Sequence, residues 1–235
     1  MSTQWINVTN DDGDTFDAYL ALPPTGEGPG LVLIQEIWGV NAHIRSLAEQ
    51  YALDGFVVLA PDVFWRQERR VDLPYDKPGS EKAFSLVKAT DAEQNGADMA
   101  ATVEYLRNLE QVTGKVGVMG FCFGGQLAYR AAAIGKPDAA VSYYGGGTHN
   151  HLDLAGNIQQ PILFHFGGED PMIPSEAVNS IQEAFADHPR AHFHVYEGAD
   201  HGFNCWGRPS YSQKAAALAH GRTLEFLAEH LSPDA

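Results

Sequence analysis

The sequence has few cysteines and few basic residues. Its 235 residues include two cysteines, Cys122 and Cys205. Two thiols do not make the disulfide framework of a small secreted domain, so each is interpreted as a free thiol. Fifteen Lys and Arg against thirty Asp and Glu give a net charge of −15, which repels nucleic acids and anionic membrane surfaces. A small molecule is therefore the expected partner.

Long apolar runs are also missing, and none of those present is long enough to cross a bilayer. The first residues, Met1 to Asp14, lack the basic segment and apolar run of a secretory signal. We therefore expect a soluble, cytoplasmic protein. The length and the 44% hydrophobic content predict one domain over residues 1–235. We expect a monomer and leave a homodimer open.

The N-terminal segment alternates between apolar and polar residues as a β-hairpin does. Trp5 to Val8 lead into the turn residues Asp11, Asp12 and Gly13, and Phe16 to Leu22 follow. After a Pro- and Gly-rich stretch at residues 23–30, short continuous apolar runs alternate with segments of helical period. This alternation is typical of βαβ units.

The apolar runs are read as buried parallel strands, at Leu31 to Ile34, Phe56 to Ala60, Val116 to Met119, Ala139 to Tyr144, Pro161 to Phe166 and His192 to Tyr196. Apolar residues at helical spacing mark the faces of helices between them, at Met99, Val103 and Leu106, at Val178, Ile181 and Phe185, and at Leu224, Leu227 and Leu231. The pattern predicts an α/β fold with a mostly parallel central sheet, helices on both faces and an antiparallel N-terminal edge.

The segment around Cys122 has the form of a nucleophile elbow. The strand ending at Met119 continues into Gly120-Phe121-Cys122-Phe123-Gly124-Gly125 and then into a helix rich in alanine. An elbow needs glycine on both sides of the nucleophile, because a Cβ there clashes with the neighbouring backbone. A helix N-terminus also favours the thiolate form of a cysteine. Cys122 is the predicted nucleophile, and a buried structural cysteine is the alternative.

Two further segments supply an acid and a histidine in the chain order of α/β-hydrolases. Asp170 follows the run Leu163 to Phe166, and His201 follows the next predicted strand. Loops at the carboxyl ends of parallel strands converge on one crevice, so the side chains are expected to meet Cys122 there. His201 then transfers protons and Asp170 holds its tautomer. Taken singly, each is equally well a loop or turn residue.

At these residues the sequence resembles the dienelactone hydrolase family over nearly the whole chain. The resemblance includes Gln35-Glu36-Ile37-Trp38-Gly39, Leu59-Ala60-Pro61-Asp62 and the segments around Asp170 and His201. It implies a Cys-His-Asp hydrolase without cofactor or metal, in which Glu36 pairs with the thiol and helps to deprotonate it. The backbone amides of Ile37 and Phe123 are the predicted donors to the oxyanion.

A thiol nucleophile favours substrates whose leaving oxygen is stabilised, because a thiolate is otherwise expelled first. We therefore expect a lactone, such as a dienelactone, or an activated ester. The resemblance implies two arginines for the substrate carboxylate, and their positions hold Ser80 and Cys205; Lys82, Arg208 and Arg66 are the candidate replacements. The predicted lining of the pocket is apolar and consists of Trp38, Phe84, Tyr144, Phe203 and Trp206.

Two alternative functions remain open from the sequence. His149, His151 and Asp153 have the spacing of a hydrolytic metal site, which predicts a metal-dependent lactonase. A hydrolase fold can also serve a non-catalytic protein that binds small molecules. The irregular segment from Phe64 to Gly79 is the predicted loop over the site.

Overall fold

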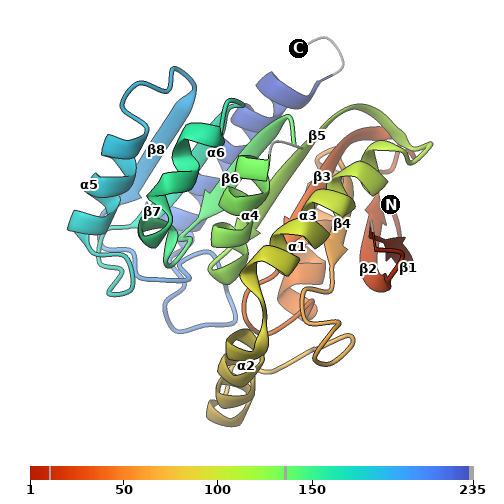
Figure 1. Cartoon of the computed structure of the whole chain (residues 1–235), viewed down its shortest axis with the longest axis horizontal. Coiled ribbons are helices and arrows are strands. Elements are labelled where there is room, and N and C mark those ends of the chain that lie inside the picture. Colours follow the sequence, from red (N-terminus) through yellow and green to blue (C-terminus); the bar gives the residue numbers. More distant parts are fainter. Residues whose placement is uncertain (11, 135–136, 233–235) are drawn as a thin grey trace.

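The computed structural model describes residues 1–10, 12–134 and 137–232. Within them, eight strands form one sheet in the order β1-β2-β4-β3-β5-β6-β7-β8 (Figure 1). The strands are β1 (Ser2–Thr9), β2 (Thr15–Leu22), β3 (Gly28–Ile34), β4 (Val57–Pro61), β5 (Val112–Phe121), β6 (Ala139–Tyr143), β7 (Ile162–Gly167) and β8 (Ala191–Tyr196). All the predicted strands are present, and the α/β fold is confirmed.

The N-terminal edge of the sheet is antiparallel, as predicted. β1 pairs with β2 from Ser2 opposite Leu22 to Thr9 opposite Thr15, and β2 pairs antiparallel with β4. In the connecting turn, Gly13 takes a φ of 86° and its amide donates to the Asn10 carbonyl. The predicted turn residue Asp11 lies outside the described residues.

The rest of the sheet is parallel, and its strand order reverses at β3. The chain passes from β3 to β4 on one side and then to β5 on the other. Ligands of open α/β sheets bind in the crevice beyond the strand ends at such a reversal. Glu36 follows β3 and Cys122 follows β5, so the topology alone brings these two residues to the crevice.

Helices cover both faces of the sheet, as predicted (Figure 1). They are α1 (Ala42–Leu53), α2 (Lys77–Ala89), α3 (Ala92–Arg107), α4 (Phe123–Ile134), α5 (Ser175–Ala184) and α6 (Gln213–Leu231). α3 and α4 pack together on one face. On the other face His220 of α6 contacts Tyr51 of α1 and Asp54, the residue that follows α1. No helix among the described residues combines the length and apolarity needed to span a membrane.

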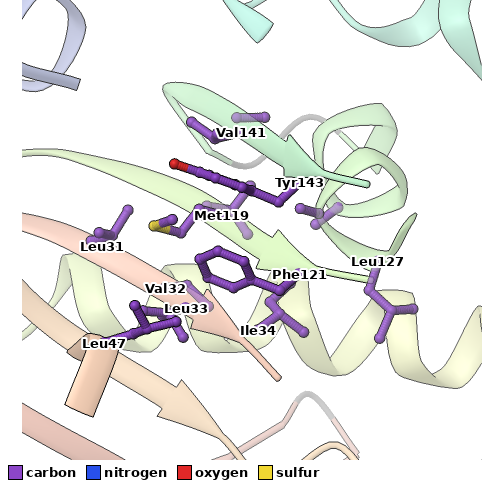
Figure 2. Packing of buried hydrophobic residues seen from close by; sticks show 14 of the residues in the cluster. Leu31, Val32, Leu33, Ile34, Leu47, Met119, Phe121, Leu127, Val141 and Tyr143 are labelled. Atoms are coloured by element: carbon purple, nitrogen blue, oxygen red, sulfur yellow. The ribbon is translucent and has the colours of Figure 1, made fainter. Parts of the chain in front are cut away.

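The core around β5 is built from alternating side chains. Met119 pairs with Leu33 on β3 and with Val141 on β6. Paired residues point to the same face of a sheet, and Figure 2 shows these side chains close to Phe121 and Tyr143. All are buried. This packing fixes the end of β5, where the elbow begins.

The segment from Phe64 to Gly79 differs from the predicted loop over the site. Phe64 and Val71 are buried, and Gly39 forms an isolated bridge with Asp72. Residues from this segment do not line the pocket at Cys122, which instead contacts Phe84 and Val87 of α2. Figure 1 shows α2 projecting beyond the end of the sheet. The prediction was wrong because buried side chains anchor the segment beside the core.

Candidate active site

The elbow holds Cys122 in a conformation that few residues other than glycine adopt. Its φ is 56°, in the left-handed region that costs an ordinary residue energy. The flanking glycines are required, because a Cβ on Gly120 would lie 2.0 Å from the Gly124 carbonyl oxygen. One on Gly124 would lie 2.4 Å from the carbonyl oxygens of Ile34 and Gln35. The turn therefore presents the sulfur at the end of β5 and the start of α4.

Three side chains from three loops form a hydrogen-bonded chain at this elbow. Cys122 Sγ lies 3.0 Å from His201 Nε2. His201 Nδ1 lies 2.7 Å from Asp170 Oδ2. Asp170 also accepts from the Met172 amide at 2.8 Å, which fixes the carboxylate. The structure thus brings together the three predicted triad residues, all of them buried.

The imidazole of His201 is held in an environment that favours its charged form. Burial alone lowers its pKa, but the hydrogen bonds and charges of Asp170 and Cys122 outweigh this and raise the pKa to about 10. The carboxylate on one side and the sulfur on the other both stabilise an imidazolium. The arrangement suits a group that takes a proton from the thiol and returns it during a reaction.

The two predicted oxyanion donors both border the pocket. Ile37 lies in the loop after β3, and Phe123 is the first residue of α4. Among the described residues, neither amide donates to another protein group. Free amides at a helix start and an adjoining loop are the usual donors to a developing oxyanion in this kind of elbow.

The pocket in front of Cys122 is mainly apolar and has a volume of about 280 Å³. Two predicted lining residues are in place, Trp38 and the exposed Phe84. Sequence reasoning missed four further residues of the lining, which are Val87, Gln126, Gly146 and Met172. Met172 was detectable in principle, since it lies two residues after Asp170 in the same loop.

Three other predicted lining residues lie elsewhere. Tyr144 and Phe203 are fully buried and pack on each other, and the Tyr144 ring backs His201 at 5.2 Å between centroids. Trp206 is half exposed and packs on His43, outside the pocket. Gly202, with a φ of 80°, reverses the chain direction after His201. Sequence proximity to His201 therefore did not place Phe203 and Trp206 in the pocket.

Glu36 occupies a buried position beside the pocket and not the position that the resemblance implies. Its Oε1 accepts from Arg208 at 3.3 Å. Burial raises the carboxyl pKa, and the charges of Arg208 and His201 act against that rise. No described contact joins Glu36 to Cys122, whose sulfur is engaged by His201.

Of the three candidate replacements for the missing arginines, one lies at the pocket. Lys82 pairs with Glu68, and Arg66 pairs with Asp98. Arg208 lines the pocket, with its guanidinium 4.9 Å from the Trp38 ring centroid. Ser80 accepts from the Trp38 indole at 3.4 Å, so this position serves the pocket wall.

The predicted metal site at His149 and His151 is not formed. Within the described part of the chain, neither histidine belongs to a group of three ligand side chains close enough to share an ion. The residues follow β6 in and between two short 3-10 helices, Thr148–Asn150 and Leu152–Asn157, and neither histidine lines the pocket at Cys122. The spacing therefore reflects a loop and not a metal centre.

Comparison with known proteins identifies the family. The model of the dienelactone hydrolase family matches residues 16–231. The chain belongs to this family. It is 38% identical to carboxymethylenebutenolidase of Pseudomonas putida and 34% identical to carboxymethylenebutenolidase 1 of Cupriavidus pinatubonensis, each over 97% of both chains. The crystal structure of a putative dienelactone hydrolase from Klebsiella pneumoniae superposes with a TM-score of 0.84 at 28% identity, covering 97% of this chain and 99% of that one.

As a member of this family, the protein is a carboxylic ester hydrolase acting on a lactone or ester. This assignment argues against the alternative of a non-catalytic protein that binds small molecules.

Proposed function

We propose that this hydrolase opens an enol lactone or cleaves an activated ester through a thioester on Cys122. The observation that carries the proposal is the 3.0 Å contact between Cys122 Sγ and His201 Nε2 at the base of an apolar pocket. A thiol beside an imidazole braced by a carboxylate is the arrangement of nucleophilic catalysis.

In the acylation step, His201 holds the proton of the thiol and the sulfur attacks the carbonyl carbon. A C–S bond forms, and the carbonyl electron pair moves onto oxygen, which the amides of Ile37 and Phe123 stabilise. The intermediate then collapses and breaks the C–O bond, leaving an acyl thioester. The departing enolate or phenolate takes the proton from His201.

In the deacylation step, a water molecule gives a proton to His201 and attacks the thioester carbon. Collapse of the second intermediate breaks the C–S bond and returns the sulfur to its pair with His201, and the acid product leaves. Asp170 keeps Nδ1 protonated throughout, so that Nε2 faces the sulfur and the water.

Glu36 has a supporting role in this proposal. The family resemblance assigns it to deprotonation of the thiol, while its carboxylate is bonded to Arg208 in this structure. We propose that Glu36 leaves Arg208 and turns toward Cys122 when substrate enters.

The test is a panel of enol lactones, aryl esters and alkyl esters, assayed with the wild type and with Cys122→Ser. The proposal predicts that kcat/KM falls from aryl and enol esters to ethyl esters by at least about a hundredfold. Cys122→Ser should lose most of the activity on the activated substrates. Equal rates on ethyl esters and enol lactones would contradict the role of the leaving group.

A further inference from the structure

A buried group of possible metal ligands lies behind the catalytic pocket. It comprises Glu36 after β3, His43 in α1 and Cys205 after His201. Each residue offers one ligand atom, and these atoms lie within 4.8 Å of one another. They are a carboxylate oxygen, an imidazole nitrogen and the sulfur. None of the three belongs to the Cys122, His201 and Asp170 chain.

Several polar atoms in this group have no partner. His43 Nδ1, His43 Nε2 and Glu36 Oε2 are buried and form no hydrogen bond among the described residues. The side chains are deeply enclosed, since His43 is 4% and Glu36 is 1% exposed. The Glu36 carboxyl also interacts with the Cys205 thiol. Buried polar atoms nearly always have a partner, so Glu36 Oε2 and the His43 nitrogen that carries the lone pair indicate a ligand.

We propose that Glu36, His43 and Cys205 bind a zinc ion. Thiolate, imidazole and carboxylate are the ligands that zinc takes in proteins, and a mixed set of this kind excludes magnesium and calcium, which prefer oxygen alone. Three protein ligands leave one coordination position for water.

The surroundings of the three ligands fit this assignment. Burial, with a smaller effect of Arg208, lowers the pKa of His43 to about 4, so the imidazole is neutral and its lone pair is free at neutral pH. Burial raises the pKa of Cys205 to about 11, so the metal must displace the thiol proton as it binds. Tyr75 shares a hydrogen bond with Cys205 and accepts another from Asn41.

Arg208 both supports and limits the site. It donates to Glu36 Oε1, which leaves Oε2 for the metal, and hydrogen-bonded carboxylates of this kind are common around zinc. Its positive charge lies next to the ion and lowers the affinity. The His43 ring packs on Trp206, which is half exposed.

Zinc in this site acts as an inhibitor of the hydrolase. Coordination holds Glu36 away from Cys122 and fixes its partner Arg208, which lines the substrate pocket. This inhibitory effect rests on the proposed function, whereas metal binding itself does not, so the two are tested separately.

The test of binding is a titration of metal-free protein with Co²⁺, which reports a thiolate ligand through a charge-transfer band in the near ultraviolet. We expect one equivalent to bind and the band to remain in Cys122→Ser. The band should disappear in Cys205→Ser, and His43→Gln should weaken binding at least about tenfold. Loss of the band in Cys122→Ser with retention in Cys205→Ser would place the metal at the catalytic pair and overturn the proposal, as would no band in the wild type.

A second measurement avoids the variants altogether. Crystals of the wild type grown with Zn²⁺ should give an anomalous difference peak between His43 and Cys205, about 2.3 Å from the sulfur. A peak at Cys122 instead, or none, would refute the site. In assays with an aryl ester, Zn²⁺ should inhibit the wild type at lower concentration than His43→Gln, which lacks a ligand but retains the catalytic pair.

Discussion

At the scale of single residues, the chemistry depends on the three side chains that hold the His201 ring in place. Its Nδ1 meets Asp170 at 2.7 Å and its Nε2 meets Cys122 at 3.0 Å, while the Tyr144 ring packs against it in a T-shaped arrangement. These contacts allow one ring orientation and one tautomer. Each partner is therefore expected to contribute to rate far more than to stability.

Asp170→Asn tests the carboxylate in particular. The amide keeps the acceptor for the Met172 N–H but cannot support an imidazolium, so kcat on an aryl ester should fall by about 10³- to 10⁴-fold. The thermal unfolding midpoint, followed by circular dichroism, should stay within a few degrees of the wild type. A loss of less than tenfold in kcat with an unchanged fold would remove Asp170 from the triad.

At the scale of elements, the close approach of β3, β5 and α4 determines the elbow. Gly124 touches the carbonyl oxygens of Ile34 and Gln35, so there is no room for a methyl group. Phe123 precedes Gly124 and Ile37 follows Gln35 by two residues, so we expect the same close approach to set the spacing of the Phe123 and Ile37 amides. Elbow geometry and oxyanion geometry are thus coupled through one glycine.

Gly124→Ala should therefore lower both stability and rate. We expect a loss of about 2–4 kcal/mol in the free energy of unfolding by urea, because the overlap forces α4 away from β3. The matched control is Gly221→Ala in α6, where a Cβ meets nothing within 4 Å. This substitution should raise the free energy of unfolding by as much as about 1 kcal/mol. Similar effects of the two substitutions would show that the close approach is not needed.

The docking of α6 on the sheet involves a buried hydroxyl. Thr223 Oγ1 lies 2.6 Å from the Tyr143 hydroxyl and 2.9 Å from His165 Nε2. Thr223→Val removes the partner of His165 Nε2 and one partner of the Tyr143 hydroxyl, while His165 Nδ1 keeps its contact with Tyr196 and Tyr143 keeps its hydrogen bond with Tyr51. The loss should cost about 1–3 kcal/mol in urea unfolding. Thr223→Ser, which keeps the hydroxyl, should cost less than half as much. Equal costs would assign the effect to packing.

At the scale of the whole molecule, buried neutral histidines make the free energy of unfolding depend on pH. Burial lowers the pKa of His165 well below its usual value and that of His43 to about 4. The unfolded chain binds protons at these groups from about pH 6.5 downward, while the folded protein does not. Their stabilising effect is therefore complete above pH 6.5 and is lost as pH falls toward the folded values.

We expect the free energy of unfolding to fall between pH 7.5 and pH 5, measured by urea with chelator present. His43 alone should account for about 2 kcal/mol of the fall, so His43→Gln should show a smaller decrease than the wild type by that amount. The same pH dependence in both proteins would mean that His43 is accessible to protons in the folded state.

The sequence was sufficient for most of the architecture. The apolar runs of β3 and β7 begin directly after a glycine or a proline, which leaves little choice of element. The triad was predictable because Cys122, Asp170 and His201 each follow a strand, and parallel strand ends meet at one edge. These are local patterns combined with one topological rule.

Side-chain direction was not predictable in the same way. Phe203 and Trp206 are near His201 in sequence, yet one enters the core and the other lies at the surface. The backbone turn at Gly202, with a φ of 80°, decides this, and a Cβ there would lie 2.0 Å from the Arg208 guanidinium. The same holds for Glu36, whose partner Arg208 lies far along the chain.

The most direct test of the account is to trap the acyl-enzyme. Wild-type protein mixed with an aryl ester is quenched in acid within the first turnover, digested and examined by mass spectrometry. The account predicts that the peptide containing Cys122 gains the mass of the acyl group, and that this adduct forms and decays at least as fast as kcat. Full turnover with no adduct on Cys122, or with an adduct on another residue, would contradict it.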